Sequence, residues 1–277
     1  MLDQASFSRW KEAILAEYPR LGLDDTFRFG CGPGVKCFNA CCADVNVFLT
    51  PYDVLRIKRK LGLDSRTFLE RHTRTITLDA RGIPLVQIRM NEDDPKACPF
   101  VGPEGCTVYE DRPWSCRMYP IGSASPAAGA DGPDAFYFVV ERFPACAGFD
   151  DEREWTVRAW KADQGIDEYE IKGEAFKAIC LHKFFRARSG LTPDKTRMMH
   201  LACYDLDTFR RFVFESSFLR RFDVEPQTLE RFRADDEALL LFGFRWLRFT
   251  LFGEKTLVMT DDAVEEGVQK MGKMFTK

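Results

Sequence analysis

The sequence has no long apolar run and no strong excess of one charge. Its longest apolar run, Ala238 to Phe252, is interrupted by Arg245 and Arg248 and is shorter than the roughly 20 residues of a membrane-spanning helix. The 40 basic and 43 acidic residues leave a formal net charge of −3, too small to attract nucleic acid or an anionic membrane. We therefore expect neither partner, and we interpret the apolar run as a buried helix.

The motifs of several common enzyme classes are also missing. The sequence contains no glycine-rich nucleotide loop, no phosphate loop and no arrangement typical of Ser/His/Asp catalysis. Only three histidines occur, and they are scattered at His72, His182 and His200. Polar residues interrupt the segment Met1 to Trp10 where a secretory signal would be apolar, which predicts a cytoplasmic protein. These absences leave the catalytic residues unassigned.

Cysteine, by contrast, is abundant and unevenly placed. The sequence has ten cysteines, and eight of them fall between residues 31 and 146. They are Cys31, Cys37, Cys41 and Cys42, then Cys98, Cys106 and Cys116, and finally Cys146. Ionised thiols would repel one another, so such a gathering is tolerable when bound cations offset the charge. In a reducing cytoplasm the pattern indicates metal ligands rather than disulfides.

The spacing leaves the number of metal centres open. Two sets of four thiols are the obvious partition, but the adjacent residues Cys41 and Cys42 normally point in different directions and could serve different metals. Structural zinc sites favour short Cys-x2-4-Cys knuckles, and only Cys37 and Cys41 have this spacing. The wider gaps favour a bulkier iron–sulfur cluster. We predict a [4Fe–4S] centre, with zinc as the alternative.

Two arginines accompany the last cysteine of the second group. Arg112 precedes Cys116 by four residues and Arg117 follows it directly. Both could donate to thiolate or sulfide as cofactor-binding residues and so raise a cluster's potential. The alternative is that they are surface residues of a loop. Cys180 and Cys203 lie outside the cysteine-rich segment, and we expect them in the core because cysteine is among the most buried residue types.

The predicted fold class is α+β. A cysteine-rich metal-binding domain with a small antiparallel sheet is expected at residues 25–150, followed by a mostly helical domain at 151–277, on which a first helix at 6–20 could pack. Thr50, Pro51 and Asp53 predict a helix start, with the helix running to about Leu61. The other elements expected before residue 151 are a helix from about Ser65 to His72, strands at 73–78, 84–90 and 135–142, a hairpin turn at 79–82 and an exposed loop at 121–133.

After residue 150 the pattern predicts helices with no strand between them. They are expected at 154–164, 167–186, 205–222 and 226–252. Arginines alternate with aromatic residues from Phe209 to Phe222, a composition that could suit nucleic-acid stacking. The helical spacing of these aromatics favours a packed face with solvated arginines opposite.

Two stretches of the sequence resemble a known family. Cys37-x3-Cys41-Cys42 is followed at 49–53 by LTPYD, and Cys98 begins the triplet CPF. Residues 106–120 read CTVYEDRPWSCRMYP. This combination resembles the YkgJ-type cysteine-cluster family, described as a zinc- or iron-chelating domain. The resemblance covers residues 31 to about 146, although the family's first motif is usually tighter, and residues 155–169 are similar to a segment that follows in longer members.

The resemblance also bears on function. Flagellin lysine N-methylase carries a similar cysteine arrangement and is associated with an iron–sulfur cluster, which implies that some relatives modify proteins. We predict that this chain binds one or two iron–sulfur centres and acts with a protein partner in electron transfer or as a redox component. The alternatives are a zinc-stabilised protein-interaction module and a cluster-dependent protein-modifying enzyme such as a protein lysine methyltransferase.

Overall fold

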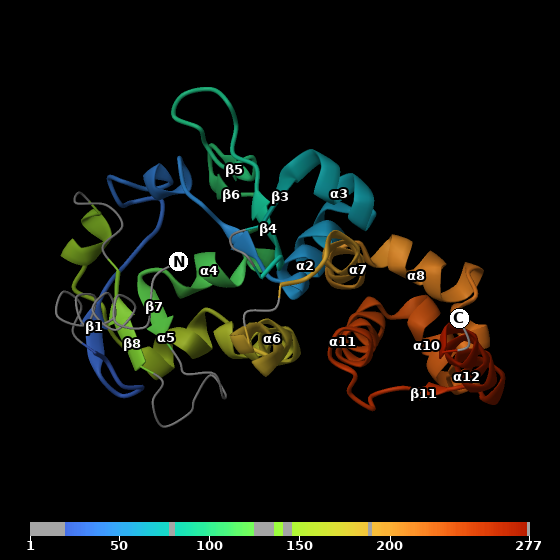
Figure 1. The fold of residues 1–277 in the computed structure, drawn as a ribbon. Helices are drawn as coiled ribbons and strands as arrows, with labels where there is room; N and C mark the ends of the chain where they lie inside the picture. Colours follow the sequence, from blue (N-terminus) through green and yellow to red (C-terminus); the bar gives the residue numbers. More distant parts are fainter. Residues whose placement is uncertain (1–19, 78–80, 125–135, 141–145, 188–189, 276–277) are drawn as a thin grey trace. The chain divides into compact units, whose positions relative to one another are not determined.

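The computed structural model describes residues 20–77, 81–124, 136–140, 146–187 and 190–275. Helices predominate and the sheets are small and antiparallel, which confirms the α+β class (Figure 1). The helix predicted near the start of the chain and the first half of the hairpin turn at 79–82 lie outside the described residues. The chain divides into two compact units: residues 1–49 with 88–174, and residues 50–87 with 175–277. We call them the thiol unit and the helical unit.

This division differs from the predicted boundary at residue 150. Residues 50–87 group with the helical unit although they lie between the two cysteine groups in sequence, and residues 151–174 group with the thiol unit. One reason is visible at the ends of the thiol unit, where residues 26–28 pair with residues 154–156. The last of the three points at which the chain passes between the units lies within a single helix, α6 (Ile166–Cys180).

The thiol unit is built from short elements. They are β1 (Thr26–Arg28), η1 (Ala40–Cys42), β2 (Phe48–Leu49), β5 (Val101–Gly102), β6 (Gly105–Cys106), η2 (Tyr109–Asp111), α4 (Trp114–Met118), β7 (Ile121–Ala124), β8 (Phe136–Val139), η3 (Ala147–Asp150), β9 (Glu154–Thr156) and α5 (Val157–Asp163). Three antiparallel pairs form among them: β1 with β9, β5 with β6, and β7 with β8.

Two predictions for this unit need correction. The strand predicted at 135–142 exists as β8, but it pairs with β7 and does not complete a sheet with the strands at 73–78 and 84–90. The loop predicted at 121–133 begins as strand β7, and its residues from 125 on are not described. Its small residues suggested a loop, but Ile121 is buried in the core and anchors the strand.

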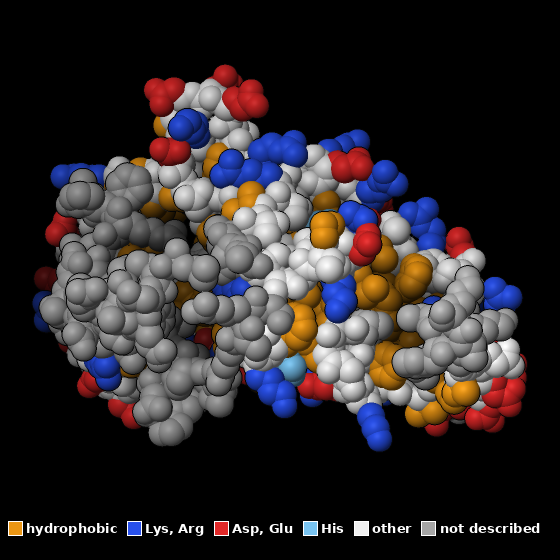
Figure 2. Space-filling view, in the orientation of Figure 1, with side chains coloured by type: hydrophobic (Ala, Val, Ile, Leu, Met, Phe, Trp, Pro, Cys, Tyr) orange, Lys and Arg blue, Asp and Glu red, His pale blue; other side chains and the backbone are white. Residues whose placement is uncertain are grey.

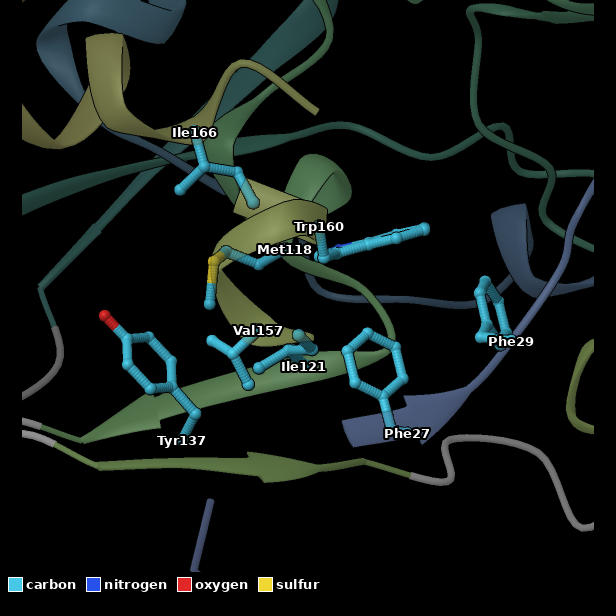
Figure 3. Close-up of a cluster of buried hydrophobic side chains, with 8 residues drawn as sticks. All are labelled: Phe27, Phe29, Met118, Ile121, Tyr137, Val157, Trp160 and Ile166. Carbon is cyan, nitrogen blue, oxygen red and sulfur yellow. The ribbon is translucent and has the colours of Figure 1, made fainter. Parts of the chain in front are cut away.

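A cluster of buried side chains fixes β1 against α5. Its members are Phe27, Phe29, Met118, Ile121, Tyr137, Val157, Trp160 and Ile166 (Figure 3). The ring of Trp160 contacts Phe27 and Phe29 edge-on, with centroids 5.9 and 5.7 Å apart. Such edge-to-face pairs add to the free energy of apolar burial. The cluster therefore holds the chain firmly two residues before Cys31.

The helical unit carries the longer elements. They are α2 (Pro51–Leu61), α3 (Ser65–His72), β3 (Thr73–Thr77), β4 (Pro84–Ile88, ending at the unit boundary), the end of α6, η4 (Lys183–Ala187), α7 (Pro193–Cys203), α8 (Leu206–Glu215), α9 (Phe218–Arg221), β10 (Phe222–Asp223), α10 (Pro226–Ala234), α11 (Asp236–Phe252), β11 (Val258–Met259) and α12 (Asp261–Phe275). The helices α2 and α3 and the strands β3 and β4 confirm the sequence-based predictions.

Local capping explains where several of these helices begin. The Thr50 hydroxyl accepts from the backbone N–H of Asp53 at 3.2 Å, and the Asp53 carboxylate accepts from the N–H of Thr50 at 2.7 Å. This capping box starts α2 at the predicted residue. The predicted helix at 226–252 is two helices, because Asp235 caps α11 by accepting from Glu237 and Ala238.

The prediction that no strand interrupts the helical half is wrong. The predicted helix at 154–164 begins as strand β9, because residues 154–156 continue the pairing with β1. The predicted helix at 205–222 is divided into α8 and α9, and its last residue starts β10, which pairs antiparallel with β11. The helix predicted at 167–186 ends at Cys180 and is followed by the short turn η4.

The apolar run lies where the sequence predicted. Helix α11 contains nine buried residues, among them Leu239, Trp246 and Leu247. Phe209, Phe218 and Phe222 are also buried, so the aromatic stretch is a packed face as expected. Within the described part of the chain, we find no helix with the length and apolar character needed to cross a membrane.

Charge is distributed unequally between the units. The thiol unit contains 14 Lys and Arg residues against 24 Asp and Glu, whereas the helical unit contains 26 against 19. The exposed loop 91–96 of the thiol unit includes Glu92, Asp93 and Asp94, and Figure 2 shows acidic side chains gathered at its tip. The small net charge of the whole chain therefore conceals an acidic unit and a basic one.

A buried ion network joins α2 to α8 and α11. The Lys58 ammonium, 5% exposed, lies 3.0 Å from the carboxylate of Asp207 and 3.1 Å from that of Asp236. Arg210 pairs with the same two carboxylates. Although burial raises the pKa of Asp207, the backbone N–H of Ser65 and the Lys58 ammonium lower it to about 2. The ionised carboxylate is therefore part of the folded state.

We expect Lys58→Met to lower the free energy of unfolding at pH 7 by about 2 to 3 kcal/mol, because it removes the most buried cation of the network and leaves Arg210 to share both carboxylates. We expect a smaller loss than for a fully buried ion pair, because the Asp207 side chain is 32% exposed and solvent screens it in part. Stabilisation from a depressed pKa is present above about 3.8 and is lost as the pH falls through about 2. Denaturant unfolding should therefore show that the difference in free energy of unfolding between variant and wild type becomes smaller as the pH falls from 7 to 2.

Arg66→Met is the matched control, since Arg66 pairs with Glu70 on an exposed face where the side chains are 66% and 65% exposed. Because solvent screens such an exposed pair, we expect no resolvable change in its free energy of unfolding. The buried ion network would be contradicted if both variants lost the same free energy of unfolding. It would also be contradicted if the difference between Lys58→Met and wild type did not change with pH.

Candidate metal centre

All eight predicted cysteine ligands are described, and all lie in the thiol unit. None of the ten cysteines of the chain forms a disulfide. Cys31 and Cys116 are exposed, and the other six of the eight are half-buried. Cys203 is fully buried in the helical unit, as expected, and Cys180 is half-buried there. The structure thus separates these two cysteines from the eight that the sequence singles out.

Four of the eight thiols line one cavity. Cys31, Cys37, Cys41 and Cys146, which we call the first thiol set, surround a cavity of about 110 Å³. One water molecule needs about 10 to 15 Å³ on the same measure. The remaining walls are apolar or aromatic and come from Phe29, Ala40, Tyr119 and Gly148. The cavity therefore has room for a group of several atoms.

Backbone pairing explains how the first thiol set forms. Cys31 follows β1, and the N–H of Gly30 donates to the carbonyl of Gly148 at 2.9 Å, which places Cys31 beside the Cys146 segment. An added Cβ at Gly148 would lie 2.8 Å from the carbonyl of Gly30, so only glycine permits this approach. Cys37 and Cys41 lie in successive tight turns, the first closed by the N–H of Ala40 on the carbonyl of Cys37.

The second thiol set consists of Cys42, Cys98, Cys106 and Cys116. The N–H of Cys98 donates to the carbonyl of Cys42 at 2.8 Å, and Ala43 and Ala97 form an antiparallel bridge. The hairpin β5–β6 then returns the chain so that Cys106 pairs with Val101, three residues after Cys98. Cys116 lies close enough to Cys42 for its charge to raise the pKa of that thiol.

The two sets therefore do not follow the order of the sequence. Cys42 belongs with the later group, and Cys146 joins the earlier one. Adjacent cysteines divide between the sets, as the sequence analysis allowed, and a hydrogen bond links the thiols of Cys41 and Cys42. This dipeptide is the point where the two thiol sets meet.

The thiols influence one another electrostatically. Although Cys31 is exposed as a residue, partial burial of its thiol, followed by the neighbouring thiols Cys41, Cys37 and Cys146, raises its pKa. The pKa of Cys42 is raised by its hydrogen bond with Cys41, by burial and by nearby thiols. Burial also raises the pKa of Cys98 and Cys106. Ionising all eight thiols would therefore require bound cations, and thiolates are ligands that soft metals and iron–sulfur centres prefer.

The spacing of the thiols limits what each set can hold. Zinc with four thiolates at about 2.3 Å would bring the sulfurs to within about 4 Å of one another. Among the residues that the structure describes, no group of three or more His, Cys, Asp or Glu side chains is placed to hold a single metal ion. The first thiol set instead surrounds a cavity. Its four thiols and apolar walls supply soft donors and space for a metal centre.

Arg112 and Arg117 are both buried, with 7% exposure, so neither is a surface residue. The Arg117 side chain donates to the carbonyls of Glu110, Arg112 and Gln164 and to the Tyr169 hydroxyl. A direct role of these arginines on a cluster stays a prediction.

Arg112 donates to the carbonyl of Tyr109 and to the side-chain oxygen of Gln164. Its charge acts to lower the pKa of Cys106, against the larger effect of burial.

Sequence reasoning missed several residues at these sites. Phe29, Tyr119 and Gly148 line the cavity, and Gln164 and Tyr169 hold the two arginines. The resemblance of residues 155–169 to a family segment was a signal for the last two. Tyr119 lies in the motif at 106–120, but no comparable pattern pointed to Phe29 and Gly148, because long-range backbone pairing brings them together.

The gathering of eight cysteines in one unit is typical of a metal-binding cysteine-cluster protein. Residues 31–134 match the model of the CxxCxxCC family, described as a putative zinc- or iron-chelating domain. This match covers less than half of the chain, and it supports the resemblance to a cysteine-cluster family noted in the sequence. No curated protein and no solved structure matches the chain.

We expect serine substitutions to sort the cysteines by thiol set, because losing one thiolate weakens one centre. Cys41→Ser and Cys146→Ser should lower the amount of cadmium bound per chain to the same extent. The double variant should bind little less cadmium than either single variant. Cys41→Ser combined with Cys42→Ser should remove the metal of both centres. Elemental analysis after anaerobic loading with Cd²⁺ measures this.

Cys203→Ala is the control, since Cys203 lies in the core of the helical unit, and it should keep the full metal content. If Cys146→Ser proved additive with Cys41→Ser and not with Cys42→Ser, the partition into these two sets would be wrong.

Proposed function

We propose that the chain binds two iron–sulfur centres of the [4Fe–4S] type, one on each thiol set, and passes electrons between a donor and an acceptor. The observation that carries this proposal is that four thiols surround one cavity with room for a group of several atoms. Each set supplies the four thiolates that such a cluster takes. The reduced thiols suit a reducing compartment, so the proposal includes a cytoplasmic location.

A bound cluster would supply one-electron oxidation and reduction. The residues of this chain would hold it and control its surroundings. Phe29, Ala40 and Tyr119 would exclude water from one side of the first centre, which lowers the local polarity around the thiolates. The cationic Arg112, buried near Cys106 and Cys116, would offset negative charge at the second centre.

Each thiol set also has one solvent-exposed member, Cys31 in the first and Cys116 in the second. An exposed ligand gives each centre an edge at which a partner could exchange electrons. Cys41 and Cys42 are consecutive and hydrogen-bonded, so the two centres would lie close together. The acidic charge of the thiol unit favours a protein partner with a basic surface.

We expect the protein purified without oxygen to be brown, with iron and acid-labile sulfide in equal amounts and about eight of each per chain for two cubane clusters. Elemental and sulfide analysis with a visible spectrum of the same sample measures this. Loss of the colour on reduction by dithionite would support electron transfer.

A colourless protein with stoichiometric zinc and no sulfide would overturn the electron-transfer proposal. The thiol unit would then be a zinc-stabilised interaction module, since zinc has no redox chemistry. The Cys203→Ala variant is again the matched control, and it should have the spectrum of the wild type.

A further inference from the structure

The strongest feature outside the thiol sets is the buried side chain of Arg117. None of its described hydrogen-bond partners is a carboxylate. Arg117 is 7% exposed, and within the part of the chain that the structure describes its side chain makes hydrogen bonds only to uncharged oxygens. Burying a charge is costly unless its donors are satisfied. The fold therefore places several acceptors around this one side chain, and their positions indicate what it does.

Two of these acceptors lie in the loop between Cys106 and Cys116. Arg117 Nε donates to the carbonyl of Arg112 at 3.0 Å, and Nη2 donates to the carbonyl of Glu110. Both carbonyls belong to or follow the turn η2. The loop thus folds around the arginine side chain, and its shape fixes how far Cys106 lies from Cys116.

The other acceptors lie more than 45 residues further along the chain. Nη1 donates to the carbonyl of Gln164 at 2.7 Å, and Nη2 donates to the Tyr169 hydroxyl at 3.1 Å. The guanidinium carbon lies 4.4 Å from the centre of the Tyr169 ring, within range of a cation–π contact. Gln164 also receives Arg112 on its side-chain oxygen.

The corner between α5 and α6 is shaped to make these contacts. Gln164 ends α5, and Gly165 has φ +62°, a left-handed conformation that glycine adopts most readily. An added Cβ at Gly165 would lie 3.4 Å from Arg117 Nη1. The turn therefore presents the Gln164 carbonyl to the arginine at close range.

We propose that Arg117 is a positioning residue for the second metal centre, which ties the Cys106–Cys116 loop to the α5–α6 corner. This inference rests on the proposed function only in assuming that the second thiol set binds a metal. Among the described residues, none of the Arg117 hydrogen bonds reaches a member of the first thiol set, which is assembled by β1, η1 and the Cys146 segment. Loss of the arginine should therefore affect one centre and spare the other.

The test compares Arg117→Lys with the matched control Arg158→Lys. Arg158 is 61% exposed in the same unit and pairs with Asp24 at 3.0 Å. Anaerobic Cd²⁺ titration should show Arg117→Lys binding one centre normally and the other about 10- to 100-fold more weakly, as is typical when the residues that orient metal ligands are changed. Adding Cys37→Ser should remove the remaining tight centre, and Arg158→Lys should bind both.

Two results would overturn the proposal. One is an Arg117→Lys variant that binds like Arg158→Lys, and the other is weakening of both centres to the same degree, which indicates a general loss of stability. If Arg117→Lys does not fold, Tyr169→Phe decides, because it removes one hydrogen bond and keeps the ring. Tyr169→Phe should lower the Cd²⁺ affinity of the second centre about 2- to 10-fold and leave that of the first unchanged. If both affinities equalled those of the wild type, the positioning role of Arg117 would be excluded.

The same samples separate this inference from the iron–sulfur proposal. Cd²⁺ binds thiolates whatever the native metal is. Anaerobic reconstitution of the wild type with ferrous iron and sulfide tests the clusters alone. A wild type that assembles no cluster but loses one Cd²⁺ centre on Arg117→Lys would refute the proposed function and keep the positioning role.

Discussion

The thiol unit is organised around one constraint: its eight clustered cysteines would repel one another if they were ionised. Burial and neighbouring thiols both favour the protonated forms, as the raised pKa of Cys31 illustrates. A bound cation reverses this balance, so metal binding and ligand ionisation are linked in one equilibrium. The fold contributes by placing the thiols in two sets rather than one. Division spreads the negative charge over two centres, and each set then needs fewer cations to neutralise it.

The unit has little regular structure with which to hold these thiols. Its strands are two to four residues long, and η1, η2 and α4 are single turns. Two devices replace longer elements. The aromatic cluster around Trp160 fixes the chain before Cys31, and the hydrogen bonds of Arg117 fix the loop before Cys116. Each thiol set thus depends on contacts that leave the cysteine motifs and reach the segment that forms α5 and the start of α6.

The sequence predicted what local chemistry determines. Thr50 and Asp53 start α2 through contacts within four residues, so the helix start was predictable. The eight cysteines stood out by their density, and the family model agrees with the general assignment. The partition into thiol sets was not predictable, because Cys42 meets Cys98 through a backbone bond across 56 residues. The burial of Arg117 was hidden for the same reason, since its partners Gln164 and Tyr169 are distant in sequence.

The pairing of β1 with β9 has a consequence for synthesis of the protein. A chain emerging from the ribosome presents Cys31, Cys37 and Cys41 long before Cys146, and β1 has no partner strand until residues 154–156 appear. The first thiol set is therefore incomplete during most of translation of the thiol unit. The second set has all four of its thiols once residue 116 has emerged, although its arginine anchor waits for residues 164–169. Maturation would thus proceed from the second centre to the first, and nascent chains would expose unligated thiols in the interval.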